Sequence, residues 1–258
     1  MKKRIVVKVG SHVLSEQNRL ARERIANLVD FLKDLHACYE VIFVSSGAVA
    51  AGYAKLRLDK SDLANRQAIA AVGQPYLMSV YQKKFEKHGI LTAQVLLTAD
   101  DFDSRRRTTH AKCAVETLLA NDAIPIINEN DVTATEELVF GDNDQLSAHV
   151  AYYFDADMLV ILSDIDGYYD ADPRAHDDAK IRAKVDRIDD AALEVDFNPH
   201  HSFATGGIVT KLKAAKFLLE RGREMYMTSG FDLEDARNFL LEGRQSGGTH
   251  FVKEDACA

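Results

Sequence analysis

Short apolar runs alternate along the chain with longer segments in which apolar residues recur every three or four positions. The runs are rich in β-branched residues and predict strands at 4–9, 40–45, 91–97, 124–127, 158–162, 224–228 and 249–252. The longer segments predict helices at 21–38, 61–88, 108–121, 143–154, 212–219 and 233–241, the second kinked near Pro75. Strands that alternate with helices predict an α/β fold. We expect a three-layer α/β/α sandwich with a mainly parallel central sheet, formed as one domain over residues 1–258.

Polar and glycine residues gather just after the predicted strands and at the starts of helices. They are Lys8 and Gly10, Ser46 and Gly47, Asn128 to Asp131, Ser163 and Asp164, and Thr205 to Lys211. Because the carboxyl ends of parallel strands meet at one edge of a sheet, we expect these residues to converge there. Glycine at a helix start gives an anion access to backbone N–H groups. Two lysines among them favour a site for a polyanion.

The stretch between Asn128 and Asp144 holds six Asn or Asp residues. One interpretation is a polar loop that caps the next helix through Asp142 or Asn143. A cap needs only one such side chain, so the excess predicts a polar site. Lys8 has two interpretations as well: a side chain that reaches water at the strand end, or a buried ammonium group that requires a partner.

Two further polar segments predict solvent-exposed structure rather than a functional site. Arg105 to Arg107 follow Asp100, Asp101 and Asp103, and we predict a solvated, self-paired turn over 100–107. Residues 176–202 are polar and poorly periodic, which predicts an excursion on the surface. The adjacent His200 and His201 have no third ligand at useful spacing, which argues against a zinc site there.

Composition excludes several classes of protein. A hydrophobic content of 47% in 258 residues supports a full core, and a net charge of −8 argues against a general binder of nucleic acid or anionic membranes. Cys38, Cys113 and Cys257 share no disulfide or zinc-ligand spacing. No apolar run approaches the ~18 residues of a membrane span, and no signal segment is apparent. We therefore expect a cytoplasmic protein.

Known nucleotide and hydrolase motifs are absent from the sequence. It contains no GxxxxGK[ST], no GxGxxG after the first strand and no GxSxG. A polyanion site beside a site for a second small polar molecule then favours phosphoryl transfer. Catalysis of that reaction is mostly positioning and charge neutralisation, which lysines supply alone or with Mg²⁺.

Seven motifs in order carry a family resemblance. They are K-V-G-S at Lys8, S-S-G-A-V-A-A-G at Ser45, A-V-G-Q at Ala71, N-E-N-D at Asn128, G-D-N-D at Gly141, D-G-Y-Y-D-A-D-P-R at Asp166 and T-G-G-I-V-T-K at Thr205. The chain thereby resembles the amino acid kinase family. The spaced N-E-N-D and G-D-N-D pair favours the branch that phosphorylates the side-chain carboxylate of L-glutamate at the start of proline synthesis. Members often carry a C-terminal PUA domain, which we expect to be absent here.

The resemblance implies a role for each candidate residue. Lys8 and Lys211 would contact the transferring phosphoryl group, and Asp144 would hold both lysines. The residues implied in substrate binding are Ser46, Gly47, Asn128, Asp131 and Asn143. Those implied in nucleotide binding are Lys8, Gly10, Ser163, Asp164, Thr205, Gly206, Gly207 and Lys211. No metal ligands are assigned.

The resemblance also implies partners: ATP with Mg²⁺, L-glutamate, and proline as a feedback inhibitor. A homo-oligomer (dimer or tetramer) is expected, with hand-off of the acyl phosphate to glutamyl phosphate reductase. One alternative is another member of the family, acting on N-acetylglutamate, aspartate or a nucleoside monophosphate. A second is a non-catalytic ligand sensor on the same fold, against which the presence of both lysines and Asp144 argues.

Overall fold

The computed structural model describes residues 2–134, 143–173, 175–193 and 207–253. The strands are β1 (Arg4–Val9), β2 (Ser15–Glu16), β3 (Arg19–Leu20), β4 (Glu40–Ser45), β5 (Thr92–Leu97), β6 (Ile124–Glu129), β7 (Met158–Ser163), β8 (Lys184–Val185), β9 (Glu224–Ser229) and β10 (Thr249–Phe251). The helices are α1 (Ser11–Leu14), α2 (Arg22–Cys38), α3 (Ala48–Tyr53), α4 (Leu63–Phe85), α5 (Arg105–Ala120), α7 (Asp144–Tyr153), α8 (Gly207–Glu220) and α9 (Glu234–Glu242). Short 3-10 turns lie at Glu86–His88, Ala99–Asp101 and Asp190–Ala192.

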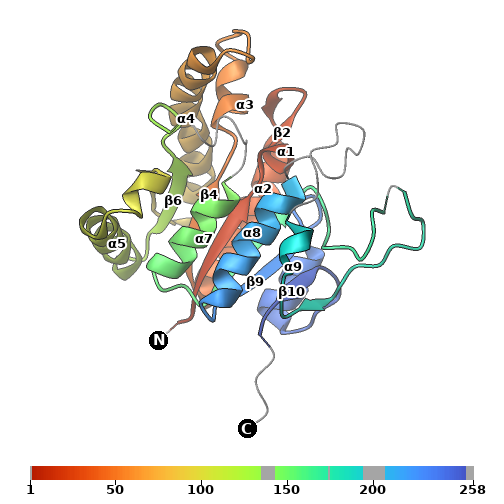
Figure 1. Ribbon diagram of the computed structural model, residues 1–258. Helices are drawn as coiled ribbons and strands as arrows, with labels where there is room; N and C mark the ends of the chain where they lie inside the picture. Colours follow the sequence, from red (N-terminus) through yellow and green to blue (C-terminus); the bar gives the residue numbers. More distant parts are fainter. Residues whose placement is uncertain (1, 135–142, 174, 194–206, 254–258) are drawn as a thin grey trace.

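One twisted sheet of eight strands runs through the molecule in the order β5-β6-β4-β1-β7-β9-β10-β8 (Figure 1). Among the described residues, β9 and β10 pair antiparallel and the other neighbours in this sheet pair parallel. β1 lies between β4 and β7, with Val9 beside both Ser45 and Leu162. The predicted mainly parallel sheet is therefore confirmed, and its carboxyl edge brings the ends of β1, β4 and β7 together.

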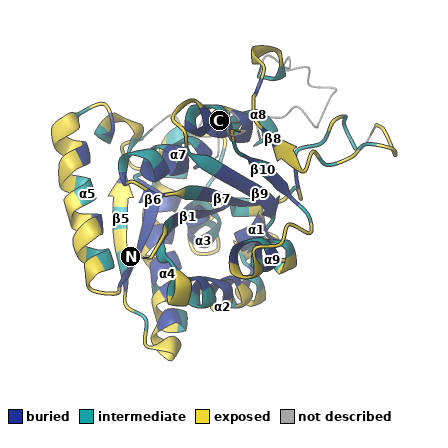
Figure 2. Cartoon of the chain, turned by 90° about the horizontal axis from the view of Figure 1, so that it is seen from below, coloured by how far each residue is buried: buried dark blue, intermediate teal, exposed yellow. Residues whose placement is uncertain are grey.

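Helices cover both faces of the sheet, as Figure 2 shows from below. Side chains alternate along a strand, so Ile5, Val7 and Val9 enter one core, with α2, α4 and α9. Val6 enters the other core, with α5, α7 and α8. Lys8 has the same parity as Val6, so its side chain leaves the sheet on the face that α7 and α8 cover. The predicted α/β/α sandwich is thus confirmed.

Helix α5 begins three residues before the predicted start, and the prediction of a turn over 105–107 is wrong. Ser104 occupies the N-cap and its hydroxyl accepts a hydrogen bond from the Arg107 amide at 3.4 Å, so the arginines form the first helical turn. The expected self-pairing is present, because Arg107 lies 3.4 Å from the Asp101 carboxylate. Helix α4 runs as one element through Pro75, and the kink there stays a prediction.

Four short elements, α1, β2, β3 and β8, were not predicted. α1 and the β2–β3 hairpin follow β1 directly, and β8 forms within the segment interpreted as a surface excursion. β6 also extends two residues beyond its predicted end and includes Asn128 and Glu129. Both side chains are buried there, so the interpretation of Asn128 as part of a loop is wrong.

Two glycines allow α3 and α4 to approach each other closely. A Cβ added at Gly73 would lie 1.8 Å from the carbonyl oxygen of Ala48, and one at Gly52 would lie 1.9 Å from that of Ile69. Neither position has room for a larger residue without moving backbone. Because α3 starts just after Ser46 and Gly47, this contact fixes α4 against the carboxyl end of β4.

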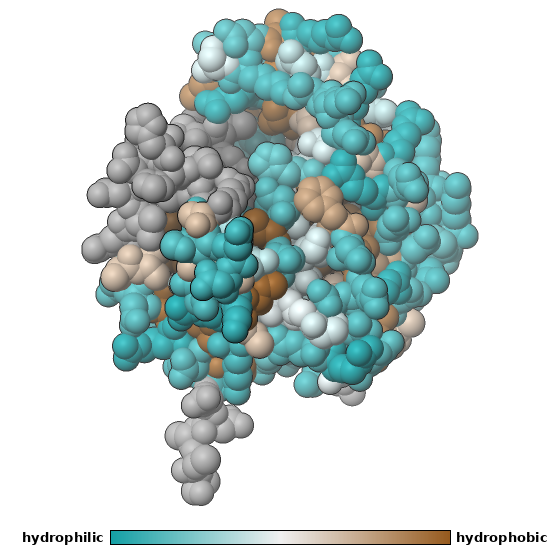
Figure 3. All heavy atoms as spheres, turned by 90° about the vertical axis from the view of Figure 1, so that its right-hand side faces the viewer, coloured by the Kyte–Doolittle hydropathy of each residue, from teal (hydrophilic) through white to brown (hydrophobic). Residues whose placement is uncertain are grey.

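The face seen in Figure 3 is predominantly hydrophilic, with scattered apolar atoms. Among the described helices, none combines the length and apolar character that crossing a bilayer requires.

Candidate active site

Lys8 is a fully buried lysine in the central strand. The exposed fraction of the residue is 0%, and its Nζ lies 2.7 Å from Oδ1 of Asp144, whose exposed fraction is also 0%. The alternative in which Lys8 reaches water at the strand end is therefore wrong. An ammonium group in a covered sheet is stable only with such a partner.

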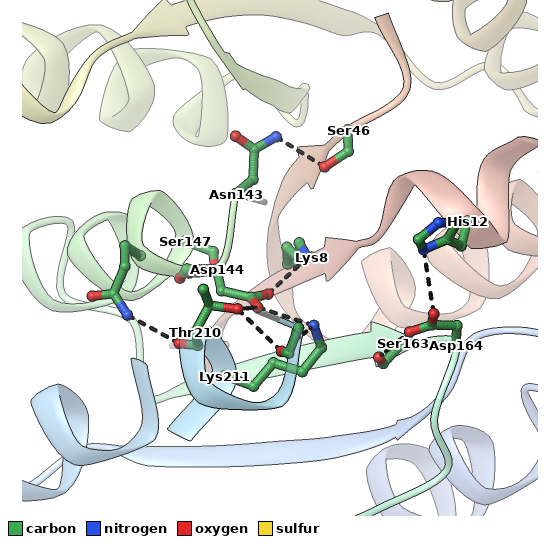
Figure 4. Close-up of polar contacts among 12 residues, drawn as sticks. Lys8, His12, Ser46, Asn143, Asp144, Ser147, Ser163, Asp164, Thr210 and Lys211 are labelled. Carbon is green, nitrogen blue, oxygen red and sulfur yellow. Dashed lines mark hydrogen bonds and ion pairs between the residues drawn. The ribbon is translucent and has the colours of Figure 1, made fainter. Parts of the chain in front are cut away.

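Lys211 approaches the same carboxylate from α8, one turn after the helix begins at Gly207. Its Nζ lies 3.1 Å from Oδ2 of Asp144 and donates to the Gly207 carbonyl at 3.0 Å, and the residue is 4% exposed. Thr210 donates from its hydroxyl to the same Oδ2 at 2.9 Å. Figure 4 shows the two lysines meeting at Asp144 from different layers of the fold. The carboxylate therefore positions both cations.

Among the described residues, Lys8, Lys211 and Asp144 form a group of three charged side chains whose formal charges sum to +1. Two ammonium groups face one carboxylate in a region from which water is largely excluded. The excess positive charge attracts an anion, and interactions between charges are stronger in this environment than at the surface. The cluster suits a phosphoryl group that gains negative charge on its oxygens during transfer.

Asn143 stands next to Asp144 in sequence, and its side chain points to a different part of the site (Figure 4). Its Nδ2 donates to Ser46 Oγ at 3.0 Å and to Asn128 Oδ1 at 2.7 Å. Asn143 occupies the N-cap position of α7, but its side chain makes no capping hydrogen bond. The predicted capping role of Asn143 is therefore wrong, and Asp142 lies outside the described residues.

Asp131 follows β6 in a turn and is half-buried. Burial, and secondarily repulsion from Glu129, raises the pKa of the Asp131 carboxyl to about 7. A carboxyl group whose pKa lies near neutrality is typical of a functional position. As a carboxylate it offers the charge complementary to an ammonium group.

A second cluster lies at the ends of β1 and β7. The Gly10 amide donates to the Leu162 carbonyl at 3.2 Å and ties the two strand ends together. Ser163 donates to Asp164 at 3.0 Å, and the other carboxylate oxygen of Asp164 lies 3.2 Å from Nδ1 of His12. In Figure 4 this cluster lies to the right of Lys8 and Lys211, apart from Asn143. The predicted nucleotide residues of this strand edge thus lie together.

Glycines shape two further turns of the site. Gly47 has φ of 104°, a left-handed conformation that favours glycine, and it turns the chain from β4 into α3. Gly207 opens α8. Thr205 and Gly206 lie outside the described residues, so their predicted role at the phosphates stays a prediction.

A family model described as the amino acid kinase family matches residues 3–229. The chain belongs to the amino acid kinase family. Glutamate 5-kinase of Leishmania donovani is 57% identical over 96% of this chain and 95% of its own length. Glutamate 5-kinase of Wolinella succinogenes is 55% identical over 97% of this chain and 98% of its own.

Solved structures agree on the fold of this amino acid kinase. Carbamate kinase from Giardia lamblia superposes with a TM-score of 0.66 at 15% identity, covering 98% of this chain and 99% of the other. UMP kinase from Ureaplasma parvum gives a TM-score of 0.63 at 14% identity, covering 98% and 100%. At such identities the likeness establishes the fold alone.

Three residues in contact with the site were not singled out from sequence. Thr210 bonds to Asp144, His12 pairs with Asp164, and Gln74 accepts a hydrogen bond from Asn128 at 2.9 Å. Thr210 and Gln74 lie inside two of the motifs that carry the family resemblance. Their place in those motifs could have marked them as candidate site residues. His12 is an exposed residue whose sequence context carries no comparable signal.

Proposed function

We propose that this protein transfers the γ-phosphoryl group of ATP to the side-chain carboxylate of L-glutamate and forms L-glutamyl 5-phosphate, the first step of proline biosynthesis. The observation that carries the proposal is the placement of Asn143 and Asp144. Asp144 gathers two buried lysines for a phosphoryl group, and Asn143 joins Ser46 and Asn128 in a polar cluster for an amino acid. The 55–57% identity to glutamate 5-kinases supports the choice of substrate.

The reaction needs no general base from the protein. A glutamate side chain has a reference pKa of about 4.3, so it is already an anionic nucleophile at neutral pH. One of its oxygens forms a bond to the γ-phosphorus while the bridging P–O bond breaks, and ADP leaves with the electron pair. The obstacle is repulsion between two anions, which Lys8 and Lys211 relieve.

Magnesium would enter with the nucleotide. In the described part of the chain, no group of three or more His, Cys, Asp or Glu side chains is arranged to hold a metal ion. Mg²⁺ often binds through one or two carboxylates together with substrate phosphates. Asp164, at the strand edge assigned to the nucleotide, is a carboxylate suited to this, and the ion would neutralise charge on the phosphates.

Trapping of the acyl phosphate tests this function. Purified protein with MgATP and hydroxylamine should form a hydroxamate with L-glutamate. Parallel reactions contain N-acetylglutamate or aspartate in its place. Equal or faster turnover of N-acetylglutamate would overturn the assignment, and no turnover of any acceptor would favour the ligand sensor.

The pKa of Asp131 predicts a pH dependence for glutamate binding. Above pH about 7 its carboxylate is charged and attracts the α-ammonium group, and below that pH it is protonated and the attraction is lost. We expect kcat/KM for glutamate to fall by up to about tenfold per pH unit below this pKa. Asp131→Asn should raise the glutamate KM and flatten the profile between pH 5.5 and 8.

The KM for ATP serves as the internal control in that experiment. The family resemblance assigns Asp131 to the amino acid substrate, so neither its protonation nor its replacement should change the KM for ATP. An unchanged glutamate KM in Asp131→Asn would show that the carboxyl group does not bind the substrate.

Four further expectations belong to this proposal. The family resemblance supports feedback inhibition by proline and assembly into a dimer or tetramer. The product is a reactive acyl phosphate, which supports direct hand-off to glutamyl phosphate reductase. We also propose a cytoplasmic location.

A further inference from the structure

Four carboxamides form a continuous chain from the substrate side of the site to the edge of the sheet. Asn143 donates to Asn128 at 2.7 Å, Asn128 donates to Gln74 at 2.9 Å, and Gln74 donates to Gln94 at 3.4 Å. Asn143 is the N-cap residue of α7, and the other three belong to β6, α4 and β5, respectively. Asn143, Asn128 and Gln74 are buried, with exposed fractions of 0%, 3% and 8%. Gln74 and its bonds play no part in the function proposed above.

The direction of this chain is determined by backbone groups. A carboxamide has one accepting end and one donating end, so each link dictates the orientation of the next. The Glu129 amide, which can only donate, bonds at 2.9 Å to Oδ1 of Asn128 and so identifies that atom as the oxygen. The opposite end of Asn128 is then its NH₂ group, and Gln74 Oε1 is the acceptor it meets.

Asn143 is oriented through the same link. Its Nδ2 donates to Asn128 Oδ1 and to Ser46 Oγ, with a longer contact of 3.5 Å to the Ser45 carbonyl, so both N–H groups are engaged. Its Oδ1, at the other end of the amide group, therefore points away from Ser46 and Asn128 and is an acceptor suited to an ammonium group. If the Asn128 amide flipped, its NH₂ group would face the NH₂ group of Asn143, and neither could accept a hydrogen bond. The orientation of Asn143 therefore depends on that of Asn128.

The packing of α4 explains why Gln74 reaches Asn128. The preceding residue, Gly73, has no side chain and lets α4 lie directly against the Ala48 carbonyl of α3. α3 in turn starts two residues after Ser46. The A-V-G-Q segment thus ties a buried glutamine to the helix that follows the substrate-binding serine.

We propose that Gln74 is a positioning residue that, together with the Glu129 amide, holds the orientation of Asn128 and, through it, of Asn143 toward the α-amino end of the substrate. This inference rests on the proposed function, since it assigns the recognised group to an amino acid. Gln74 itself bonds to Asn128 and Gln94 rather than to reacting atoms, so its effect belongs to binding and selectivity. It predicts that glutamate is preferred over glutarate, which lacks the α-amino group, partly because of Gln74.

The experiment compares three substitutions at Gln74 with a control on the same helix. Gln74→Met preserves length without a donor or acceptor, Gln74→Asn is too short to reach Asn128, and Gln74→Glu keeps an accepting oxygen in either protonation state. Gln82→Met makes the same change at an exposed position of α4. For each variant, KM for glutamate and ATP, kcat/KM for glutarate and the thermal unfolding midpoint are measured.

We expect Gln74→Met and Gln74→Asn to raise the glutamate KM by about tenfold or more, because Asn128 loses its acceptor. The ATP KM should stay unchanged, and the preference for glutamate over glutarate should fall by at least about fivefold. In Gln74→Glu and Gln82→Met, the glutamate KM and the preference for glutamate over glutarate should both stay within about threefold of wild type.

A merely structural role would lower the unfolding midpoint without changing the preference between the two acceptors. The inference is overturned if either Gln74→Met or Gln74→Asn folds and keeps the wild-type glutamate KM and preference. If Gln74→Met fails to fold, the comparison of Gln74→Asn with Gln74→Glu tests the inference: the first should lose the glutamate preference and the second should keep it. Wild-type turnover of glutamate in the same assay tests the proposed function separately, and if wild type uses another amino acid, KM for that acceptor is compared instead.

Discussion

Asp144→Asn is expected to lower kcat by at least about 100-fold and the free energy of unfolding by about 3 kcal/mol or more. The substitution preserves size and leaves an oxygen that can accept one hydrogen bond. It removes the negative charge shared by Lys8 and Lys211, which lie 2.7 and 3.1 Å from the carboxylate. Two buried ammonium groups then face a neutral amide and each other. Urea unfolding followed by circular dichroism, together with the hydroxamate assay, measures both effects.

Asp34→Asn is the matched control for this prediction. Asp34 forms a 2.6 Å ion pair with Arg237, but its side chain is 33% exposed and lies away from the site. An exposed pair contributes about 1 kcal/mol or less, so stability and activity should change little. Equal stability losses in the two variants would mean that burial of the Asp144 cluster carries no special cost. Wild-type kcat in Asp144→Asn would remove Asp144 from the catalytic arrangement.

Much of the fold follows from local patterns in the sequence. The β-branched run at β1 and the periodic apolar residues of α2 bury the side chains that the patterns predict. The short elements α1, β2, β3 and β8 span two to four residues each and show no periodicity to detect. The true start of α5 depends on Ser104, one capping residue whose effect outweighs the charged composition around it.

The sequence indicated which residues belong to the site, but not how they are arranged in space. A lysine in a central strand requires a partner, yet that partner is 136 residues away and no spacing rule connects the two. Asn128 was interpreted as a loop residue because it begins a run of Asn, Glu and Asp side chains that is ill-suited to a core. In the folded protein Gln74, 54 residues away, and Asn143 satisfy its amide, so it extends the strand into the core.

Asn143 and Asp144, at the start of α7, serve two different parts of the site. Asn143 points toward β4 and β6, and Asp144 points toward β1 and α8 (Figure 4). One helix start therefore sets the position of the amino acid cluster relative to the lysines. A displacement of α7 would move both groups together, which keeps the acceptor in line with the phosphoryl group.

Lys8→Met and Lys211→Met are each expected to lower kcat by at least about 100-fold, with a smaller change in the glutamate KM. Methionine has a similar length and is apolar, so it fills the buried space without supplying charge. Each variant leaves one lysine on Asp144, which satisfies the carboxylate but cancels the excess positive charge of the cluster. Steady-state kinetics with varied glutamate and ATP separate the effect on kcat from the effects on binding.

Lys216→Met tests whether the loss is specific to the site. Lys216 lies on α8 with Lys211, but it is partly exposed and pairs with Asp190 and Glu220 on the surface. Its replacement removes the same charge from the same helix and should leave kcat within about twofold. If Lys8→Met or Lys211→Met retained more than about a tenth of wild-type kcat, Coulombic stabilisation by that lysine would be too weak to account for catalysis. Backbone N–H groups and the nucleotide's Mg²⁺ would then have to supply the neutralising charge.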